Sequence, residues 1–147
     1  MNRLYTEDAR KKPVFDIHTI DIPDDEVGVI LQLISDLYDD PSIEAIYLYG
    51  SYARSEQKPY SDIDIAVITG SSTPTRKERE HIGSYSSKKC DIQVFSDLPL
   101  PAQMQVLSQG VPLMCKHPDY MRKLIRSVSL TYMDQEPMRD RFRRRIL

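Results

Sequence analysis

The sequence predicts a single α/β or α+β domain built around a small β-sheet. Three short apolar segments of strand length are separated by segments whose apolar residues recur at helical spacing. The chain has 147 residues, which is enough for one hydrophobic core and too few for two domains of usual size. We therefore expect residues 1–147 to form one domain, with a loose segment at 1–13 and a basic tail at 137–147.

The first helix is expected to begin after Pro23, with Asp24 or Asp25 as its N-terminal cap. Apolar residues then recur at intervals of three and four and form one stripe along the helix. This stripe comprises Val27, Ile30, Leu31, Ile34, Leu37 and Tyr38. The polar segment at 39–42, which contains a proline, is expected to end the helix.

Helices are also expected in three later parts of the chain. A short polar helix covers residues 76–82, and another opens at the proline-containing segment 99–101 and ends at Gly110. The last helix begins near Pro118, and Pro137 is expected to break or restart it. The apolar stripe of this last helix consists of Met121, Leu124, Ile125, Val128 and Tyr132.

The strands are predicted from short apolar runs. Residues 43–49 and 62–68 are typical of strands buried on both faces, and residues 89–95 form a third strand. The Gly-Ser pair at 50–51 ends the first of these strands, and a short helix is expected to follow it. Residues 14–22 alternate between apolar and polar, which indicates a strand or an extended arm.

Composition excludes several classes of protein. The net charge of −2 argues against a protein that wraps nucleic acid. The apolar runs are far shorter than a membrane span, and the polar N-terminus does not resemble a signal peptide, so a cytoplasmic location is expected. Cys90 and Cys115 are far apart and outside any CxxC pair, which favours reduced thiols.

The end of the chain is rich in arginine. Three interpretations are open: a solvated helix end whose charge suits the helix dipole, a surface that docks on an acidic partner, or a contact with RNA. The arginines are Arg139, Arg141, Arg143, Arg144 and Arg145.

Asp62 and Asp64 open an otherwise apolar strand. Residues two apart in a strand point to the same face, with Cα atoms roughly 6.5–7 Å apart. Ile63, Ile65 and Val67 then point into the core. Two carboxylates on one face repel each other unless a cation lies between them, and Mg²⁺ prefers such oxygen ligands.

Gly50 and Ser51 precede this pair, with ten residues between Ser51 and Asp62. They lie where a strand ends and a helix is expected to begin, so free backbone amides there would form a phosphate site. Glycine allows the backbone to approach an anion closely, and the serine hydroxyl adds a hydrogen-bond donor. The spacing therefore places a phosphate cradle beside a pair of metal ligands.

Asp91 is the third candidate carboxylate. It lies in the third predicted strand, where Asp91, Gln93 and Phe95 share one face. If the sheet brings Asp91 next to Asp62 and Asp64, the three carboxylates can hold two Mg²⁺ ions and activate an attacking hydroxyl. The alternative is a charged residue on an edge strand.

The run LYGSYARSEQKPYSDIDIAV resembles the active-site motif of the DNA polymerase β-type nucleotidyltransferase superfamily, and within it the minimal nucleotidyltransferase (MNT) family. The matching residues are Gly50, Ser51, Ala53, Arg54, Ser61, Asp62, Asp64 and Asp91. The resemblance implies a nucleotidyltransferase fold, in which helices flank a small mixed sheet. It also implies two Mg²⁺ ions as cofactors and ATP as the usual substrate.

The resemblance also implies roles for these residues. Asp62 and Asp64 would ligate both metals, and Asp91 would hold the catalytic metal and help to deprotonate the acceptor hydroxyl. All three are thus candidate catalytic and metal-binding residues.

Four residues are implied in nucleotide binding. Gly50 and Ser51 would bind the β- and γ-phosphates. Arg54 would contact the triphosphate or brace the loop, and Ser61 would also take part in nucleotide binding. Ser55 stands where the family pattern has glycine. If that position requires a positive φ angle, serine is strained there.

MNT proteins are commonly encoded beside a HEPN-domain RNase toxin. The resemblance therefore implies transfer of AMP onto a tyrosine of such a partner, with this chain as the antitoxin. Two alternatives are a non-catalytic antitoxin that acts by binding alone, and a small-molecule nucleotidyltransferase. The latter usually carries an added helical domain, for which this chain has little room.

Overall fold

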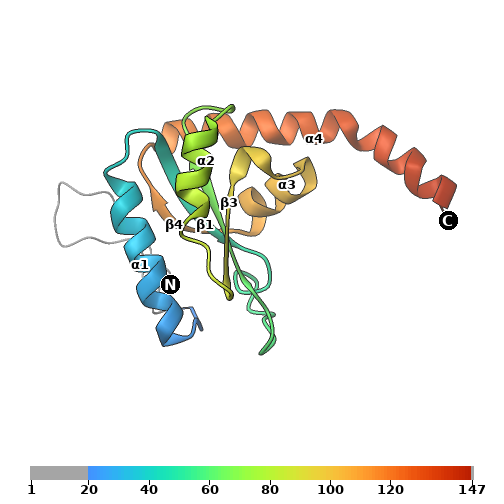
Figure 1. Cartoon of the computed structure of the whole chain (residues 1–147). Coiled ribbons are helices and arrows are strands. Elements are labelled where there is room, and N and C mark those ends of the chain that lie inside the picture. Colours follow the sequence, from blue (N-terminus) through green and yellow to red (C-terminus); the bar gives the residue numbers. More distant parts are fainter. Residues whose placement is uncertain (1–19, 147) are drawn as a thin grey trace.

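The computed structural model describes residues 20–146, and their side chains except at 139, 140 and 142–146. The chain runs through nine elements in this part (Figure 1). In order they are α1 (Asp24–Tyr38), β1 (Ile43–Tyr49), β2 (Ile63–Thr69), α2 (Arg76–Gly83), β3 (Cys90–Val94), the 3₁₀ helix η2 (Phe95–Asp97), α3 (Leu100–Gln109), β4 (Val111–Cys115) and α4 (Pro118–Ile146).

The strands form one mixed sheet in the order β3-β2-β1-β4. β1 pairs antiparallel with β2 and with β4, whereas β2 and β3 are parallel. The parallel pair requires a crossover, which α2 supplies. The predicted class, a small mixed sheet flanked by helices in one domain, is confirmed.

Each face of the sheet carries its own hydrophobic cluster. Alternation along β2 sends Ile63, Ile65 and Val67 to the face covered by α1 and α2. Ala66 and Ile68 point to the other face, where α3 and α4 pack. The central strands are therefore buried on both sides, as their apolar sequences predict.

Two elements differ from the sequence-based expectation. β4 was not predicted, because its five residues (VPLMC) contain Pro112 and follow directly on α3. Proline is tolerated there because β4 lies at the edge of the sheet. The helix expected after Gly50 is also wrong, since residues 51–55 form turns.

Helix α1 corrects two details of the prediction. Pro23 occupies the N-cap position and no side chain caps the helix, so the assignment of Asp24 or Asp25 as the cap was wrong. The buried stripe contains Leu33 in place of Leu31, which is 42% exposed. Its acidic first turn still favours the helix through the dipole.

Helix α4 continues through Pro137, so the expected break there was wrong. In its stripe, Met121 and Val128 are buried, whereas Ile125 is exposed. The helix extends past the rest of the molecule and bends in its C-terminal part, as a proline within a helix predicts (Figure 1).

Several expectations fall outside the described residues. These are the loose segment at 1–13, most of the predicted strand or arm at 14–22, and the side chains of four of the five C-terminal arginines. Both cysteines are free, with Cys90 buried and Cys115 half-buried. None of the described helices combines the length and apolar character needed to cross a bilayer.

The structure buries Leu33 and exposes Leu31, the reverse of the predicted stripe, and this difference can be tested directly. Leu33→Ala is expected to lower the free energy of unfolding by about 2–5 kcal/mol, because a fully buried side chain leaves a cavity. Leu31→Ala, on the same helix but exposed, should cost less than about 1 kcal/mol. Urea denaturation of both variants measures the difference, and equal losses would contradict the packing described.

Candidate active site

Three neighbouring strands carry polar residues of the candidate site in one row. Asp64 of β2 is the register partner of Tyr49 on β1 and of Asp91 on β3. Residues opposite each other in a sheet point to the same face. On that face the next pair inward is Tyr47 and Ala66, which belong to the cluster beneath α3 and α4. The sheet thus places two predicted carboxylates side by side where its apolar core ends.

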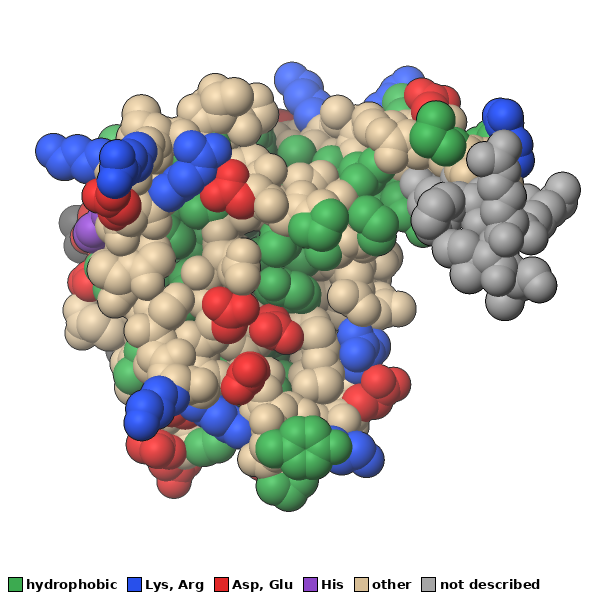
Figure 2. Space-filling model, turned by 45° about the vertical axis from the view of Figure 1, so that its right-hand side comes forward, with side chains coloured by type: hydrophobic (Ala, Val, Ile, Leu, Met, Phe, Trp, Pro, Cys, Tyr) green, Lys and Arg blue, Asp and Glu red, His purple; other side chains and the backbone are tan. Residues whose placement is uncertain are grey.

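The surroundings of Asp64 disfavour its charged form. Burial, followed by the charges of Asp91 and Asp62, raises the pKa of Asp64 from 3.8 to about 6, although Arg54 acts in the opposite sense. Burial and the carboxylates of Asp64 and Asp91 raise the pKa of the Tyr49 phenol to about 12. A cation between these groups would relieve the repulsion. Figure 2 shows acidic side chains gathered near the middle of one face.

Gly50 lies against the carboxylate of Asp64. Its φ angle is +76°, and a Cβ atom at this position would collide with Oδ2 of Asp64 and lie 3.3 Å from Cγ. Both the backbone conformation and the close approach therefore require glycine. The end of β1 and the carboxylate on β2 are held next to each other, as the predicted pairing of a phosphate cradle with metal ligands requires.

The turn after Gly50 resembles the first turn of a helix. The Arg54 amide donates to the carbonyl oxygens of Gly50 and Ser51, at 3.3 and 3.2 Å, and the Glu56 amide donates to Ser51 at 2.9 Å. Among the described residues, Arg54 carries the first amide that donates within this turn. The amides of residues 51–53 precede it, in the position of free amides at a helix N-terminus.

Ser55 has a φ angle of +56°, and no other described non-glycine residue has a positive φ. The conformation that the family glycine provides is therefore retained here by a serine. The left-handed region costs a non-glycine residue roughly 1–2 kcal/mol. The conditional prediction of strain at this position is confirmed.

Arg54, Ser61 and Asp62 lie in or beside the loop between β1 and β2. Arg54 Nε lies 3.0 Å from Oε2 of Glu56, and Oγ of Ser61 accepts a hydrogen bond from the Lys58 amide at 2.8 Å. Both contacts brace the loop, and a role of either residue toward a nucleotide stays a prediction. Asp62 is exposed and precedes β2, which begins one residue later than predicted.

The oxygen donors of this site suit a hard divalent cation such as Mg²⁺. Asp64 and Asp91 are adjacent, and Asp62 is close enough to influence the pKa of Asp64. No three His, Cys, Asp or Glu side chains converge as metal ligands anywhere in the described part of the chain. The residues fit Mg²⁺ chemically, since this ion is commonly held by one or two carboxylates together with water and substrate phosphates, and the metal roles stay a prediction.

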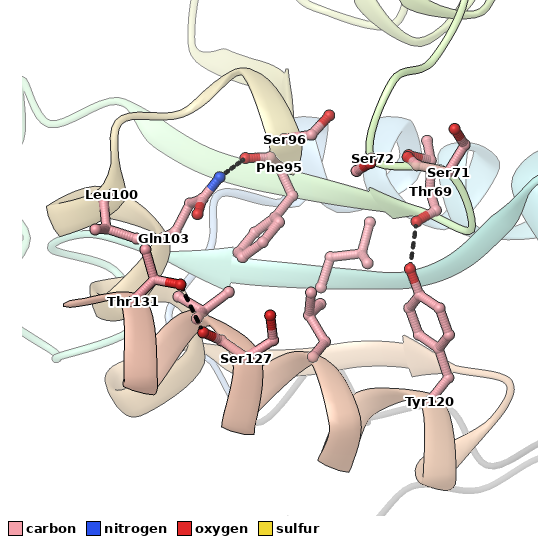
Figure 3. Close-up of a pocket in the computed structure, with 13 residues that line it drawn as sticks. Thr69, Ser71, Ser72, Phe95, Ser96, Leu100, Gln103, Tyr120, Ser127 and Thr131 are labelled. Atoms are coloured by element: carbon pink, nitrogen blue, oxygen red, sulfur yellow. Dashed lines mark hydrogen bonds between the residues drawn. The ribbon is translucent and has the colours of Figure 1, made fainter. Parts of the chain in front are cut away.

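A cavity of about 250 Å³ lies on the same face at the other end of β2. Its floor is apolar, with Ile68 and Phe95, and hydroxyl groups surround it (Figure 3). Ile68 is four residues beyond Asp64, so roughly 13 Å separates the two positions. No charged side chain lines the cavity, and it is therefore distinct from the carboxylate row.

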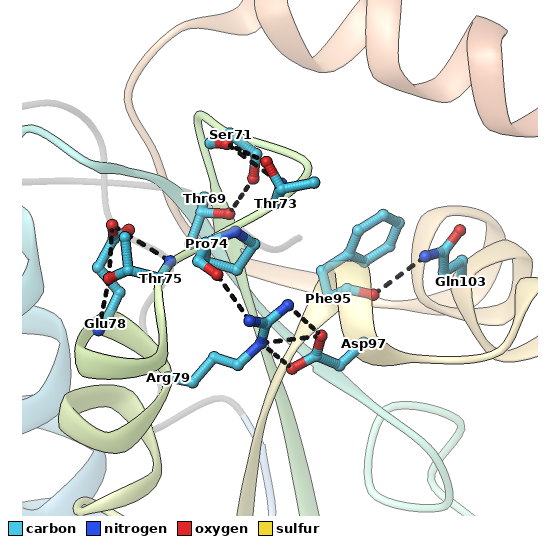
Figure 4. A network of polar contacts seen from close by, with 10 residues as sticks. All are labelled: Thr69, Ser71, Thr73, Pro74, Thr75, Glu78, Arg79, Phe95, Asp97 and Gln103. Atoms are coloured by element: carbon cyan, nitrogen blue, oxygen red, sulfur yellow. Dashed lines mark hydrogen bonds and ion pairs between the residues drawn. The ribbon is translucent and has the colours of Figure 1, made fainter.

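A polar network closes that same end of the sheet (Figure 4). The Arg79 guanidinium donates to both carboxylate oxygens of Asp97, at 2.9–3.1 Å, and to the carbonyl oxygen of Pro74 at 2.7 Å. The network ties α2 and the preceding loop to η2. This end of the sheet is thus occupied by structural contacts, and the carboxylate end is the one available for chemistry.

A family model described as polymerase beta, nucleotidyltransferase matches residues 32–119. The chain belongs to this family. The matched region runs from within α1 to the start of α4 and contains Gly50, the turn that follows it, and all three candidate carboxylates. The family resemblance expected from the sequence is therefore confirmed for the polymerase β-type nucleotidyltransferases.

One curated relative is a protein of Methanocaldococcus jannaschii named as a candidate protein adenylyltransferase, MJ1547. It is 37% identical over 62 residues, which make up 42% of this chain and 48% of that protein. The chain thus matches about half the length of this relative.

Solved nucleotidyltransferase-fold neighbours come from toxin–antitoxin complexes. A chain of a toxin–antitoxin complex with AMP-PNP superposes with a TM-score of 0.62 at 24% identity, over 81% of this chain and 96% of that one. A chain from the complex of a tri-AMPylated Shewanella oneidensis HEPN toxin with an MNT antitoxin gives 0.54 at 24% identity, over 78% and 93%. These similarities support the fold.

The sequence did not single out two residues beside the carboxylates. Tyr49 is the register partner of Asp64, and Nε2 of Gln93 donates to Oδ2 of Asp91 at 3.1 Å. Alternation placed Gln93 on the face of Asp91, but only the strand register shows what lies opposite Asp64. That register is not encoded in any local pattern.

The raised pKa of Asp64 predicts a pH-dependent stability. The folded pKa of about 6 lies above the ordinary value of 3.8, so protonation favours the folded state, and this stabilisation is lost as pH rises from about 4 through 6. Asp64→Asn should therefore raise the free energy of unfolding of the protein in EDTA at about pH 8 and leave it unchanged near pH 4. Denaturation at both pH values, with Asp39→Asn as an exposed control, measures this; equal effects at both would contradict it.

The strain at Ser55 predicts a stabilising substitution. Ser55→Gly should raise the free energy of unfolding by up to about 1 kcal/mol, because relief of the left-handed conformation outweighs the added flexibility of glycine. Ser84→Gly is the matched control, since Ser84 has a φ of −64° and should lose stability. Thermal denaturation compares the two, and a loss at Ser55→Gly would contradict the strained conformation.

Proposed function

We propose that this protein is a Mg²⁺-dependent adenylyltransferase that transfers AMP from ATP to a hydroxyl group of a partner protein. The acceptor is a tyrosine of a HEPN-domain RNase toxin, and the modification makes this chain an antitoxin. The observation that carries the proposal is the row of Asp64 and Asp91 across neighbouring strands, with Gly50 against the first carboxylate.

The carboxylates would supply the ligands for a divalent cation and the base that accepts a proton. Asp62 and Asp64 would hold Mg²⁺, which would supply positive charge to neutralise the triphosphate. Asp91 accepts the proton of the acceptor hydroxyl as its oxygen bonds to the α-phosphorus of ATP. The bond between the α-phosphorus and its bridging oxygen breaks, and pyrophosphate leaves. No nucleophilic side chain of this protein is needed, because positioning and charge neutralisation dominate such transfers.

The turn after β1 holds the remaining phosphates. Gly50 brings the backbone close to the metal ligands, and the Ser51 hydroxyl and the amides that follow donate to the β- and γ-phosphates. Arg54, which lies near Asp64 and pairs with Glu56, adds positive charge at the edge of the turn. Ser61 keeps the loop in shape through its bond from the Lys58 amide.

The partner assignment is supported by the relatives. One is named as a candidate protein adenylyltransferase, and the solved neighbours include a complex with AMP-PNP and one with an AMPylated HEPN toxin. The described domain has one sheet with four helices around it, and the helix that projects from it is basic at its end.

Transfer of labelled AMP tests the proposal. The purified chain, ATP, Mg²⁺ and a HEPN-domain toxin from the same organism are expected to give an AMP adduct on a tyrosine of the toxin, located by mass spectrometry. Asp64→Asn and Asp91→Asn should lower the rate at least roughly a hundredfold, because the metal contributes several kcal/mol to the transition state. Asp39→Asn, an exposed control, should retain the rate.

Unchanged transfer in Asp64→Asn would overturn the catalytic assignment. If Asp62→Asn abolishes transfer but still protects cells from the toxin, the chain acts as an antitoxin by binding alone. Transfer to an aminoglycoside or another small hydroxyl compound, with none to the protein, would favour the small-molecule alternative.

A further inference from the structure

Helix α4 is much longer than its contact with the domain. It has 29 residues, and Val128 is its last buried side chain among those described. The 18 residues that follow extend for about 27 Å at 1.5 Å per residue, and Figure 1 shows the C-terminal part of α4 running past the rest of the molecule. Most of the stability of a helix in a protein comes from packing of its apolar face. The projecting half has no buried side chain among those described, so its exposed apolar residues are available to a binding partner.

Tyr132, four residues after Val128, is half-buried and continues the buried stripe, whereas Leu130 and Met133 do not. At about 100° per residue, Leu130 lies about 200° around the helix from Val128, and Met133 lies about 140° from it. Both are thus on the face opposite the sheet, where Leu130 is 51% and Met133 is 62% exposed. Packing within the described domain does not account for them.

These two residues belong to a longer row, which we call the outer stripe. Its members are exposed and follow one another at intervals of four, three, four and four residues, so they share one side of the helix. The outer stripe consists of Arg126, Leu130, Met133, Pro137 and Arg141. Its centre is apolar, both ends carry a guanidinium group, and it spans about 22 Å. Figure 2 shows hydrophobic and basic side chains exposed on the projecting part.

We propose that the outer stripe docks an amphipathic helix of the partner protein, one with apolar residues at its centre and acidic residues at both ends. An apolar seam on a helix is matched best by another helix, whose side chains interdigitate with it. The terminal arginines fix the register and favour carboxylates opposite them. Leu130 and Met133 supply the apolar contact, and Met has the flexible side chain common at such surfaces.

Charge argues against a second copy of this chain as the occupant. In the antiparallel arrangement that brings the two apolar centres together, Arg126 of one copy lies opposite Pro137 of the other and one turn from its Arg141. In a parallel arrangement each arginine faces its own counterpart. Like charges in these positions are destabilising. The last eight residues of α4 also carry five arginines and one aspartate in the sequence, which increases the preference for an acidic partner.

The inference rests on the proposed function in one respect: the partner that docks is the protein that receives AMP. The outer stripe is separate from the carboxylate row, so docking and chemistry are separable by mutation. Loss of docking should raise the KM for the protein acceptor and leave the affinity for the nucleotide unchanged.

Binding of a HEPN-domain toxin from the same organism tests the inference. Leu130→Glu and Arg126→Glu are expected to raise the Kd for this protein at least tenfold, because a charge is then buried or reversed at the seam. Gln135→Glu adds the same charge to the same helix on the side facing away from the stripe, and should bind as the wild type does. Leu130→Ala serves as a milder variant, and affinity for AMP-PNP with Mg²⁺ reports that each variant is folded.

Each outcome decides the proposal. A wild-type Kd in Leu130→Glu, or no binding by the wild type, would overturn it. A dimer in light scattering that Leu130→Glu converts to a monomer would assign the stripe to a second copy instead. If the wild type binds but transfers no AMP, the proposed function fails while the docking surface stands. If Leu130→Glu transfers AMP with an unchanged KM for the protein acceptor, the docking proposal is contradicted and the proposed function stands.

Discussion

The organisation of this protein depends on one carboxylate, Asp64, which the sheet holds half-buried and beside other carboxylates, where its charged form is disfavoured. Asp64 is half-buried in a central strand, between the phenol of Tyr49 and the carboxylate of Asp91. The pairing of three strands fixes this row, and the large apolar core on the opposite face provides the stability that compensates for it. The strain at Ser55 adds a second local cost beside the same row. Such local costs are commonly concentrated where a site must be preorganised.

The same constraint explains how the rest of the chain is arranged around the site. Gly50 must lack a side chain because Asp64 occupies the space that a Cβ would take. The turn that follows therefore starts beside the carboxylate of Asp64, and the amides of residues 51–53 precede the first amide that donates within it. The hydroxyl-lined cavity and the Arg79–Asp97 network lie at the far end of the sheet and leave the carboxylate end uncovered.

Much of this could be predicted from the sequence, and the failures have physical reasons. The apolar runs of β1 and β2 and the Asp-x-Asp pair were found because they follow from local periodicity. β4 was missed because an edge strand with a proline lacks that pattern. The predicted stripe contains Leu31 and omits Leu33. Both positions fit a helical stripe, and only packing against the sheet shows which one is buried. The pairing of Asp64 with Asp91 depends on a parallel register set by a crossover, which no sequence spacing determines.

Binding of a non-hydrolysable ATP analogue, measured by calorimetry with Mg²⁺ and again with EDTA, tests the central claim most directly. If the carboxylate row and the turn at Gly50 form a metal–nucleotide site, AMP-PNP should bind the wild type in Mg²⁺, and this binding should disappear in EDTA and in Asp64→Asn. Binding that is equally tight in EDTA, or that survives loss of the Asp64 carboxylate, would contradict the account.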